Sequence, residues 1–341
     1  MDQRTLEART GNPAQWADLQ LMTVSDGPGL GMRSILLTTA GGLQVEILPD
    51  RGLDLARARF KGINLTWLGP GGDSHPHARD QAPRGWGKSF HGGLMTLCGL
   101  ENIGPPSIDV GSGTALGQHG EITFAQAEGL ILEKDHAHNR LCVKGTLRQA
   151  YLGGSKLQID RTLEADADGT SIALTDRVRN SGWQSVPLMV LYHSNFGWPF
   201  VSEDLTWTSP SPKVEPRDEA ATRGRENWHT FEAPQPGFEE QVYFHHLTQG
   251  AIEPWATARL ENPVLGLGVE LSFDSSTLTH LTQWKLCGHG DYVLGIEPGN
   301  APPLGQWEAQ KAGALPMLEP GEEVEFHLEW EFFELPKIRR A

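Results

Sequence analysis

Two short polar segments, residues 192–199 and 295–300, each follow an apolar run that is typical of a β-strand. The first opens with Tyr-His-Ser-Asn and carries His193, and the second opens with Gly-Ile-Glu-Pro and carries Glu297. A protonated histidine and an ionised carboxylate are a workable general acid and general base near neutral pH. We therefore expect this pair to transfer protons. A hydrogen-bonded structural histidine and a glutamate paired with an arginine are the alternatives.

Three further places carry side chains that could contact a ligand. His119 lies in Gly-Gln-His-Gly, and His91 begins His-Gly-Gly. Glycine lets a backbone approach a ligand closely, although a simple turn explains both patterns equally well. Trp284 and Lys285 together offer an aromatic face and a hydrogen-bonding group, and an edge strand with an amphipathic lysine is the alternative reading.

The thirteen histidines do not form a convincing metal motif. His75 and His77, like His136 and His138, have an i, i+2 spacing in polar, loop-like sequence. None of these belongs to an H-E-x-x-H arrangement or to a cluster with cysteines, and no phosphate-binding glycine loop is present. The sequence therefore predicts no metal and no cofactor.

Alternating apolar and polar residues mark the strands that must position these groups. Residues 34–39 and 42–48 predict a hairpin, residues 157–164 and 171–180 predict a second one around a turn at 166–169, and residues 323–332 predict a closing strand. A short helix is expected within 12–19, after Asn12 as its cap and Pro13 at its first position. The pattern favours one all-β domain over residues 1–341, with 1–20 as an extension or short helix.

Composition limits the partners and the compartment. The net charge of −15 argues against nucleic acid and against an anionic membrane surface, because both need clustered Lys and Arg. Three widely spaced cysteines make no disulfide framework, so buried thiols are expected. The first residues lack the apolar core of a signal peptide, and no run approaches the ~18 apolar residues of a membrane span. The cytoplasm is the expected location.

Five motifs together resemble a known family. They are residues 49–54 (PDRGLD), 92–100 (GGLMTLCGL), 118–120 (QHG), 192–197 (YHSNFG) and 295–300 (GIEPGN). In these residues and in their order, the chain is similar over about 20–335 to the uncharacterised aldose 1-epimerase-like family known as DUF4432, of the galactose mutarotase-like superfamily. The resemblance implies a β-supersandwich of twisted antiparallel sheets layered around a cleft.

The same resemblance implies roles for individual residues. His193 is similar to the general acid of the mutarotases, Glu297 to their general base, and His119 to the histidine that binds a sugar hydroxyl or the ring oxygen. The sugar-binding arginine is placed at Arg84 and the acidic binding residue at Glu240. Four other residues are expected to contact the substrate: His91, Trp284, Lys285 and Asn300.

We therefore expect an isomerase that interconverts the anomers of a free aldose by acid–base ring opening, with a small sugar as its partner. The chain could form a homodimer. A non-catalytic carbohydrate-binding or sensor protein on the same fold is the alternative, because a fold does not certify a function. A lyase or a phosphosugar epimerase is a third reading; the latter would need clustered Arg or Lys, for which only Arg84, Lys88 and Lys285 are candidates.

Overall fold

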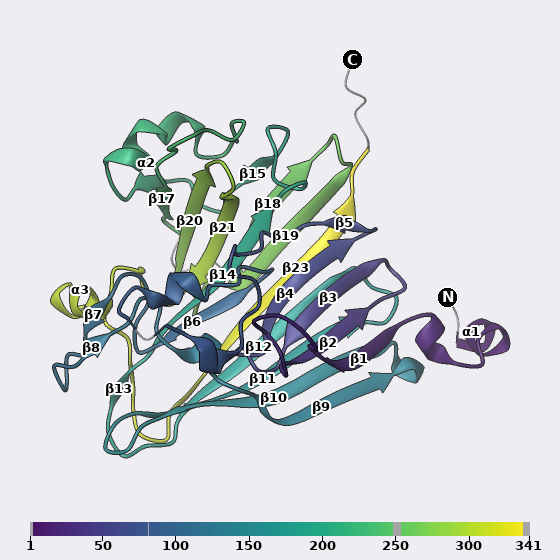
Figure 1. Ribbon diagram of the computed structural model, residues 1–341, viewed down its shortest axis with the longest axis horizontal. Coiled ribbons are helices and arrows are strands. Elements are labelled where there is room, and N and C mark those ends of the chain that lie inside the picture. The colour runs from purple at the N-terminus through teal and green to yellow at the C-terminus, as the bar shows by residue number, and fades with distance from the viewer. Residues whose placement is uncertain (1–2, 81, 248–253, 337–341) are drawn as a thin grey trace.

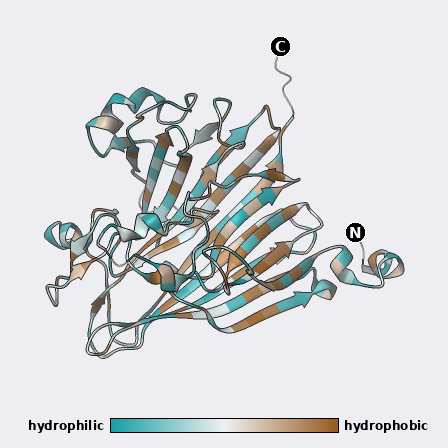
Figure 2. Ribbon diagram, in the orientation of Figure 1, coloured by the Kyte–Doolittle hydropathy of each residue, from teal (hydrophilic) through white to brown (hydrophobic). Residues whose placement is uncertain are grey.

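Apolar and polar residues alternate along most of the long strands, as the banding in Figure 2 shows. The computed structural model describes residues 3–80, 82–247 and 254–336. Strand β11 (Lys156–Asp166) is representative, because Leu157, Ile159 and Leu163 are buried while Asp160 is exposed. It pairs antiparallel with β12 (Ser171–Asn180). The predicted hairpin around 166–169 is therefore confirmed.

Three antiparallel sheets contain most of the strand residues of the described chain (Figure 1). The five-stranded sheet contains β1 (Asp18–Thr23), β2 (Arg33–Thr38), β3 (Leu43–Leu48), β4 (Asp54–Phe60) and β5 (Ile63–Asn64). The eight-stranded sheet has the order β15 (Thr206–Thr208), β18 (Trp255–Asn262), β19 (Leu267–Asp274), β23 (Glu323–Glu334), β12, β11, β10 (Arg140–Ala150) and β9 (Glu128–Asp135). The six-stranded sheet, at the upper left of Figure 1, has the order β16 (Val214–Pro216), β17 (Gln241–His245), β20 (His280–Cys287), β21 (Tyr292–Gly299), β14 (Met189–Gly197) and β6 (Thr96–Leu100).

Short elements complete the fold. Two-stranded pairs are formed by β7 (Ser107–Ile108) with β8 (Ala115–Leu116) and by β13 (Val186–Pro187) with β22 (Met317–Leu318). The α-helices are α1 (Gln3–Arg9), α2 (Glu219–Arg223) and α3 (Gln306–Lys311). The 3-10 helices are η1 (Pro13–Gln15), η2 (Pro76–Ala78), η3 (Gly85–Lys88), η4 (Ile122–Phe124), η5 (His136–His138) and η6 (Arg225–Asn227). Within the described ranges, no helix is both long and apolar enough to cross a membrane.

Most of the predicted elements are present, with one shift near the N-terminus. Strands β2 and β3 form the expected hairpin, and Gly42 in its turn has φ 93°, a conformation that favours glycine. The predicted C-terminal strand is β23. The segment expected to be helical after Asn12 forms only the three-residue η1, because the next strand already begins at Asp18. The α-helix of this region, α1, lies before it.

One cluster of buried apolar side chains joins the three sheets. It includes Ile35 from the five-stranded sheet, Ile159 from the eight-stranded sheet and Ile296 from the six-stranded sheet. The three cysteines are free and buried, as expected. The chain therefore has the layered antiparallel arrangement of a galactose mutarotase-like β-supersandwich.

A buried ion pair fastens the six-stranded sheet to the eight-stranded one. The Arg161 guanidinium donates hydrogen bonds of 2.7 and 2.6 Å to the two carboxylate oxygens of Asp176, and neither side chain is exposed. The Tyr192 hydroxyl of β14 donates to Asp176 Oδ2 at 2.8 Å. The Asp176 carboxylate of β12 therefore holds both Arg161 of β11 and Tyr192 of β14 in position.

Replacing that carboxylate should destabilise the fold strongly. Asp176→Ala leaves the Arg161 guanidinium buried without its counter-ion, which costs about 3–5 kcal/mol. Glu325→Gln is the control, since Glu325 pairs with Arg177 on the neighbouring surface and both side chains are more than 40% exposed. An exposed pair is worth about 0–1 kcal/mol. Urea unfolding measures both free energies, and equal losses for the two variants would contradict the dependence on Asp176.

Candidate active site

Two inward-facing neighbours determine the direction of His193. The Tyr192 hydroxyl binds Asp176, and Ser194 Oγ accepts a hydrogen bond of 3.1 Å from Trp330 Nε1 of β23. Side chains alternate along a strand, so the residue between these two anchors must point to the other face of the sheet. His193 therefore lies on the face turned away from the eight-stranded sheet.

The pairing of β14 with β21 places Glu297 beside His193. Leu191 pairs with Gly299 and Ser194 with Ile296, so the same register sets His193 opposite Glu297. Their closest atoms, His193 Nε2 and Glu297 Oε1, are 3.2 Å apart. Both polar motifs continue within strands rather than following them, because β14 runs to Gly197 and β21 to Gly299. The His193–Glu297 pair is consequently held on a sheet rather than on a loop.

A glycine makes room for this pair. Gly295 lies two residues before Glu297 on the same face of β21 and opposite Trp284 of β20. A Cβ at this position would come within 2.6 Å of Glu297 Oε1 and within 3.3 Å of His193 Cε1. Only a residue without a side chain lets the carboxylate and the imidazole approach each other here.

His119 reaches the same place from a loop. Its φ of 53° is left-handed, and its backbone is held by Gly104 and Gly99, which bind its N–H and its carbonyl. The backbone N–H of Gly104 also donates to Nδ1 of the imidazole at 3.4 Å. The ring centroid lies 5.9 Å from that of His193. His119, His193 and Glu297 therefore converge, as the family resemblance implies.

Aromatic rings close over the pair. The ring centroids of Phe90 and Trp284 lie 5.2 and 5.6 Å from that of His193. Trp86 of η3 stacks on Phe90 at 4.4 Å and packs on His119 at 4.5 Å. His193 is only 5% exposed and Glu297 only 3%. These aromatic rings cover the pair instead of framing an open cleft.

Burial sets the charge of the pair. Loss of water raises the pKa of the Glu297 carboxyl to about 8, with repulsion from Glu240 adding to the effect and Arg217 opposing it. Burial lowers the pKa of the His193 imidazole to about 3, with a contribution from His119, whose own pKa burial lowers to about 4. Near neutral pH the carboxyl is therefore protonated and the imidazole neutral. The pair is therefore uncharged, whereas the sequence predicted a protonated histidine and an ionised carboxylate.

Three polar atoms around the pair have no hydrogen-bond partner in the described part of the chain: Trp86 Nε1, His193 Nδ1 and Glu297 Oε1. The 3.2 Å contact between Glu297 and His193 is close but not aligned as a hydrogen bond. A buried polar group without a partner costs about 1–3 kcal/mol. The Trp86 indole N–H, the His193 imidazole nitrogen and the Glu297 carboxyl could each form a hydrogen bond with a ligand that has several hydroxyl groups.

Glu240 and Trp284 border the pair, together with an arginine that the sequence did not suggest. The Trp284 indole N–H donates to Glu240 Oε2 at 3.2 Å, and Arg217 Nη2 lies 2.9 Å from Glu240 Oε1. Glu240 and Arg217 also act on the pKa of Glu297. These three side chains line the β17–β20 side of the site.

The structure places the other predicted residues elsewhere. Lys285 follows Trp284 and so points to the opposite face, where its ammonium lies 2.9 Å from Glu232. His91 is fully buried beside Asp54. The Asn300 amide accepts from the N–H of Val190 and donates to the carbonyl of Leu188, which ties β21 to the start of β14. Arg84 is exposed, two residues before Trp86, and none of the described contacts joins it to His193 or Glu297.

No group of three or more His, Cys, Asp or Glu side chains among the described residues is arranged to hold a metal ion. The His193 imidazole, the Glu297 carboxyl group and the neighbouring His119 lie together at the site within aromatic walls. Such a set can donate a proton to one atom of a ligand and remove a proton from another.

Sequence reasoning missed Trp86, Phe90, Gly295 and Arg217. Phe90 immediately precedes the His91 that was proposed, so its position in a glycine-rich loop was the available signal. Gly295 was visible only as a glycine inside an apolar strand, which often marks close approach of another group. No local pattern distinguishes Arg217 from other loop arginines.

Comparisons with known proteins identify the family and the fold of this chain. A family model described as "Domain of unknown function (DUF4432)" matches residues 29–332. A candidate aldose 1-epimerase from Klebsiella pneumoniae subsp. pneumoniae MGH 78578 has a similar structure, with a TM-score of 0.87 and 24% identity over 93% of this chain and 84% of that one. A galactose 1-epimerase from Lactobacillus acidophilus NCFM has a TM-score of 0.63 and 13% identity over 94% of this chain and 99% of its own.

A galactose mutarotase-like protein from Clostridium acetobutylicum gives a TM-score of 0.63, with 15% identity over 94% of this chain and 100% of that chain. No curated protein matches the sequence. At these identities the likeness concerns the fold.

The raised pKa of Glu297 predicts a pH-dependent stability. Between the ordinary carboxyl pKa of 4.5 and about 8, the unfolded chain loses a proton that the folded protein keeps. Stability should therefore fall as the pH rises, by up to about 1.4 kcal/mol per pH unit. Glu297→Gln has no titrating carboxyl at this position and should not show this decrease. From about pH 5.5 to 7.5, the free energy of unfolding of wild type should therefore fall by roughly 2 kcal/mol more than that of the variant.

Urea unfolding at several pH values measures this difference, with Glu308→Gln on the exposed surface of α3 as the control. The lowered pKa of His193 acts in the opposite direction between about pH 3 and the ordinary histidine pKa of 6.5, and this contribution is present in both proteins. Parallel pH profiles for wild type and Glu297→Gln would show that the carboxyl is ionised in the folded protein.

Proposed function

The chain belongs to the DUF4432 family, and on that premise we propose that it is an aldose 1-epimerase-like enzyme that interconverts the anomers of a reducing sugar. The observation that supports this most is the cross-strand placement of His193 opposite Glu297, 3.2 Å apart on one sheet face. The reaction needs one group to protonate the ring oxygen and another to deprotonate the neighbouring C1 hydroxyl. The pair offers one of each.

The reaction can be written with these two side chains alone. One group removes the proton of the C1 hydroxyl while the other protonates the ring oxygen, the bond between C1 and the ring oxygen breaks, and an open-chain aldehyde forms. Rotation about the C1–C2 bond exposes the other face of the carbonyl. The hydroxyl oxygen that was the ring oxygen then attacks C1 and returns its proton to the group that supplied it, while the carbonyl oxygen takes back the proton removed from the C1 hydroxyl, which closes the other anomer. Every proton is recovered, so no co-reactant is consumed.

The pair holds one titratable proton, which suits a reaction that runs in both directions. In the resting site the proton is on Glu297 and His193 is neutral, because burial disfavours both charges. A shift of the proton to the imidazole gives the ionised form, with Glu297 as base and His193 as acid, that the mutarotase resemblance implies. His193 Nε2 and Glu297 Oε1 are 3.2 Å apart, so this transfer requires the two side chains to become aligned as a hydrogen bond, which they are not in the resting site.

The surroundings have roles in this proposal. Trp86 and Phe90 occupy the space over the pair, so a sugar ring that contacts both groups must displace them. His119 then faces the ligand beside His193, with Nδ1 held by the Gly104 N–H and Nε2 left to bind a hydroxyl. Trp284 supplies an apolar face for the C–H groups of a sugar.

The resting geometry also supports a second candidate, a sugar-binding protein without turnover. Its basis is the closure of Trp86 and Phe90 over a pair that is only 3–5% exposed and uncharged. Binding without acceleration of anomer exchange would identify that case. A phosphosugar is less well supported, because the nearby Arg217 is already paired with Glu240 and Asp218.

Removal of either proton-transferring group should abolish most of the activity. Glu297→Gln and His193→Asn keep hydrogen bonding but cannot exchange protons. Each should slow anomer exchange by ~10²-fold or more while sugar binding survives. The double variant should be much less than multiplicatively worse, because the two groups act in one proton relay. Magnetisation-exchange NMR on a panel of aldoses measures the rates and calorimetry measures binding.

Wild-type exchange rates in both single variants would contradict the mutarotase proposal. Tight sugar binding by wild type without acceleration for any sugar in the panel would replace it with the binding-protein candidate.

Substitution of Gly295 provides a test in which both His193 and Glu297 are retained. Gly295→Ala puts a methyl group 2.6 Å from Glu297 Oε1, so the carboxylate must move away from the His193 ring. Exchange should fall by ~10²-fold, since a misplacement of about 1 Å has that effect. Gly11→Ala, whose added methyl group meets nothing within 4 Å, is the control. Full activity of Gly295→Ala, with an unchanged melting temperature, would show that the close approach is unimportant.

A further inference from the structure

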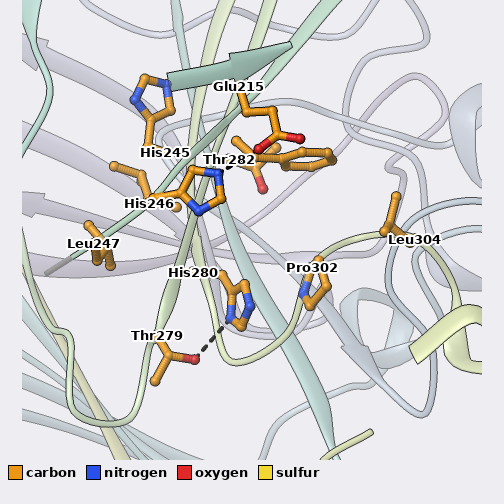
Figure 3. A pocket seen from close by; sticks show the side chains of 11 residues that line it. Glu215, His245, His246, Leu247, Thr279, His280, Thr282, Pro302 and Leu304 are labelled. Atoms are coloured by element: carbon orange, nitrogen blue, oxygen red, sulfur yellow. Dashed lines mark hydrogen bonds and ion pairs between the residues drawn. The ribbon is translucent and has the colours of Figure 1, made fainter. Parts of the chain in front are cut away.

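A hollow on the same sheet as the acid–base pair is not used by the reaction as described. It has a volume of about 620 Å³, within the usual range of about 300–1,000 Å³ for ligand pockets. We call it the Phe244 hollow and define it by Glu215, Phe244, His246, His280, Thr282 and Leu304. Figure 3 shows the His246 and His280 imidazoles next to each other, with Glu215 beyond His246 and Pro302 beside His280.

Strand register connects this hollow to the reaction site. Glu215 of β16 pairs with Phe244 of β17, Phe244 with Thr282 of β20, and Thr282 with Glu297 of β21. Directly paired residues point to the same face, so this row continues through Glu297 to His193. Strands are about 4.8 Å apart, which puts Phe244 roughly 10 Å and Glu215 roughly 14 Å from Glu297. The row is longer than one pyranose ring. Thr282 lies between the His193–Glu297 pair and Phe244, so it borders both the reaction site and the Phe244 hollow.

The chemistry of the hollow is that of a carbohydrate site. Phe244 is partly exposed and offers an aromatic face, and Leu304 adds apolar surface. Around them lie hydrogen-bonding groups. Glu215 Oε2 is 2.9 Å from His246 Nε2, and His280 Nδ1 is 2.9 Å from Thr279 Oγ1.

An anionic ligand fits this hollow less well. None of the described lining residues is Lys or Arg, and the cation nearest to the lining carboxylate, Lys213, lies 3.8 Å from Glu215 Oε2 and so is already paired. Burial and the neighbouring His246 lower the pKa of His280, which favours an uncharged imidazole that both donates and accepts. The hollow therefore matches the alternating apolar faces and hydroxyl edges of a neutral sugar.

From this row we infer that the substrate is a reducing oligosaccharide, whose terminal ring lies against His193 and Glu297 and whose next sugar unit binds in the Phe244 hollow. The inference rests on the proposed function for the reaction at the terminal ring. It adds the substrate class and a second binding position. Thr282 lies at the junction of the two units.

Two measurements test it. Anomer exchange is compared by NMR for the reducing disaccharides maltose, cellobiose and lactose and for glucose and galactose, in wild type, Phe244→Ala and His280→Gln. The ratio of kcat/KM for the best disaccharide to that for its reducing-end monosaccharide should exceed one in wild type. It should fall about tenfold in Phe244→Ala, the loss expected for one stacking ring. Trp183→Ala, which removes an indole that is 92% exposed, should leave the ratio unchanged.

Calorimetry with the methyl glycosides of the same sugars, which cannot open, reports binding without reaction. The disaccharide glycoside should bind wild type more tightly than the monosaccharide glycoside, and Phe244→Ala or His280→Gln should remove the difference.

If no sugar is turned over but this difference in binding holds, the proposed reaction fails and the second binding position stands. Turnover of monosaccharides with no advantage for any disaccharide in rate or binding would overturn the inference alone. Preferred binding of glucose 6-phosphate over the disaccharides would overturn it in favour of an anion.

Discussion

The antiparallel register between β14 and β21 is the constraint on which the site depends. Register places His193 opposite Glu297, and the inward anchors on either side of His193 decide the face on which the pair lies. A shift of one residue would turn the imidazole into the sheet interface and Tyr192 away from Asp176. The buried Arg161–Asp176 ion pair therefore fixes the orientation of His193 through Tyr192, although neither Arg161 nor Asp176 contacts that imidazole in the described hydrogen bonds.

Desolvation is the second determinant of the site. Water is excluded by Trp86, Phe90 and Trp284, and this exclusion moves the pKa values of Glu297 and His193 in opposite directions. The resting pair is consequently neutral with one proton, which costs less in a dry site than two separated charges. A hydroxylated ligand that enters would supply hydrogen bonds to atoms that now have none.

Local sequence was sufficient for the strands, because alternation is a local signal, whereas the roles of the site residues came from the family resemblance and stay predictions. The sequence predicted the β11–β12 hairpin and named His193, Glu297 and His119. Alternation also implies that Trp284 and Lys285 face opposite ways, but not which of them faces the site. Contacts made by loops, such as those of Trp86 and Arg217, depend on how distant segments pack, so no spacing in the chain predicts them.

A crystal structure of Glu297→Gln with a bound reducing sugar tests the central claim most directly, since slow turnover would leave the ligand in place. The account predicts a ring between His193 and position 297, with the C1 hydroxyl and the ring oxygen each within about 3.2 Å of one of these two side chains. It also predicts that Trp86 and Phe90 have moved off the pair. A sugar bound elsewhere, with both aromatic rings still packed over His193, would contradict the account.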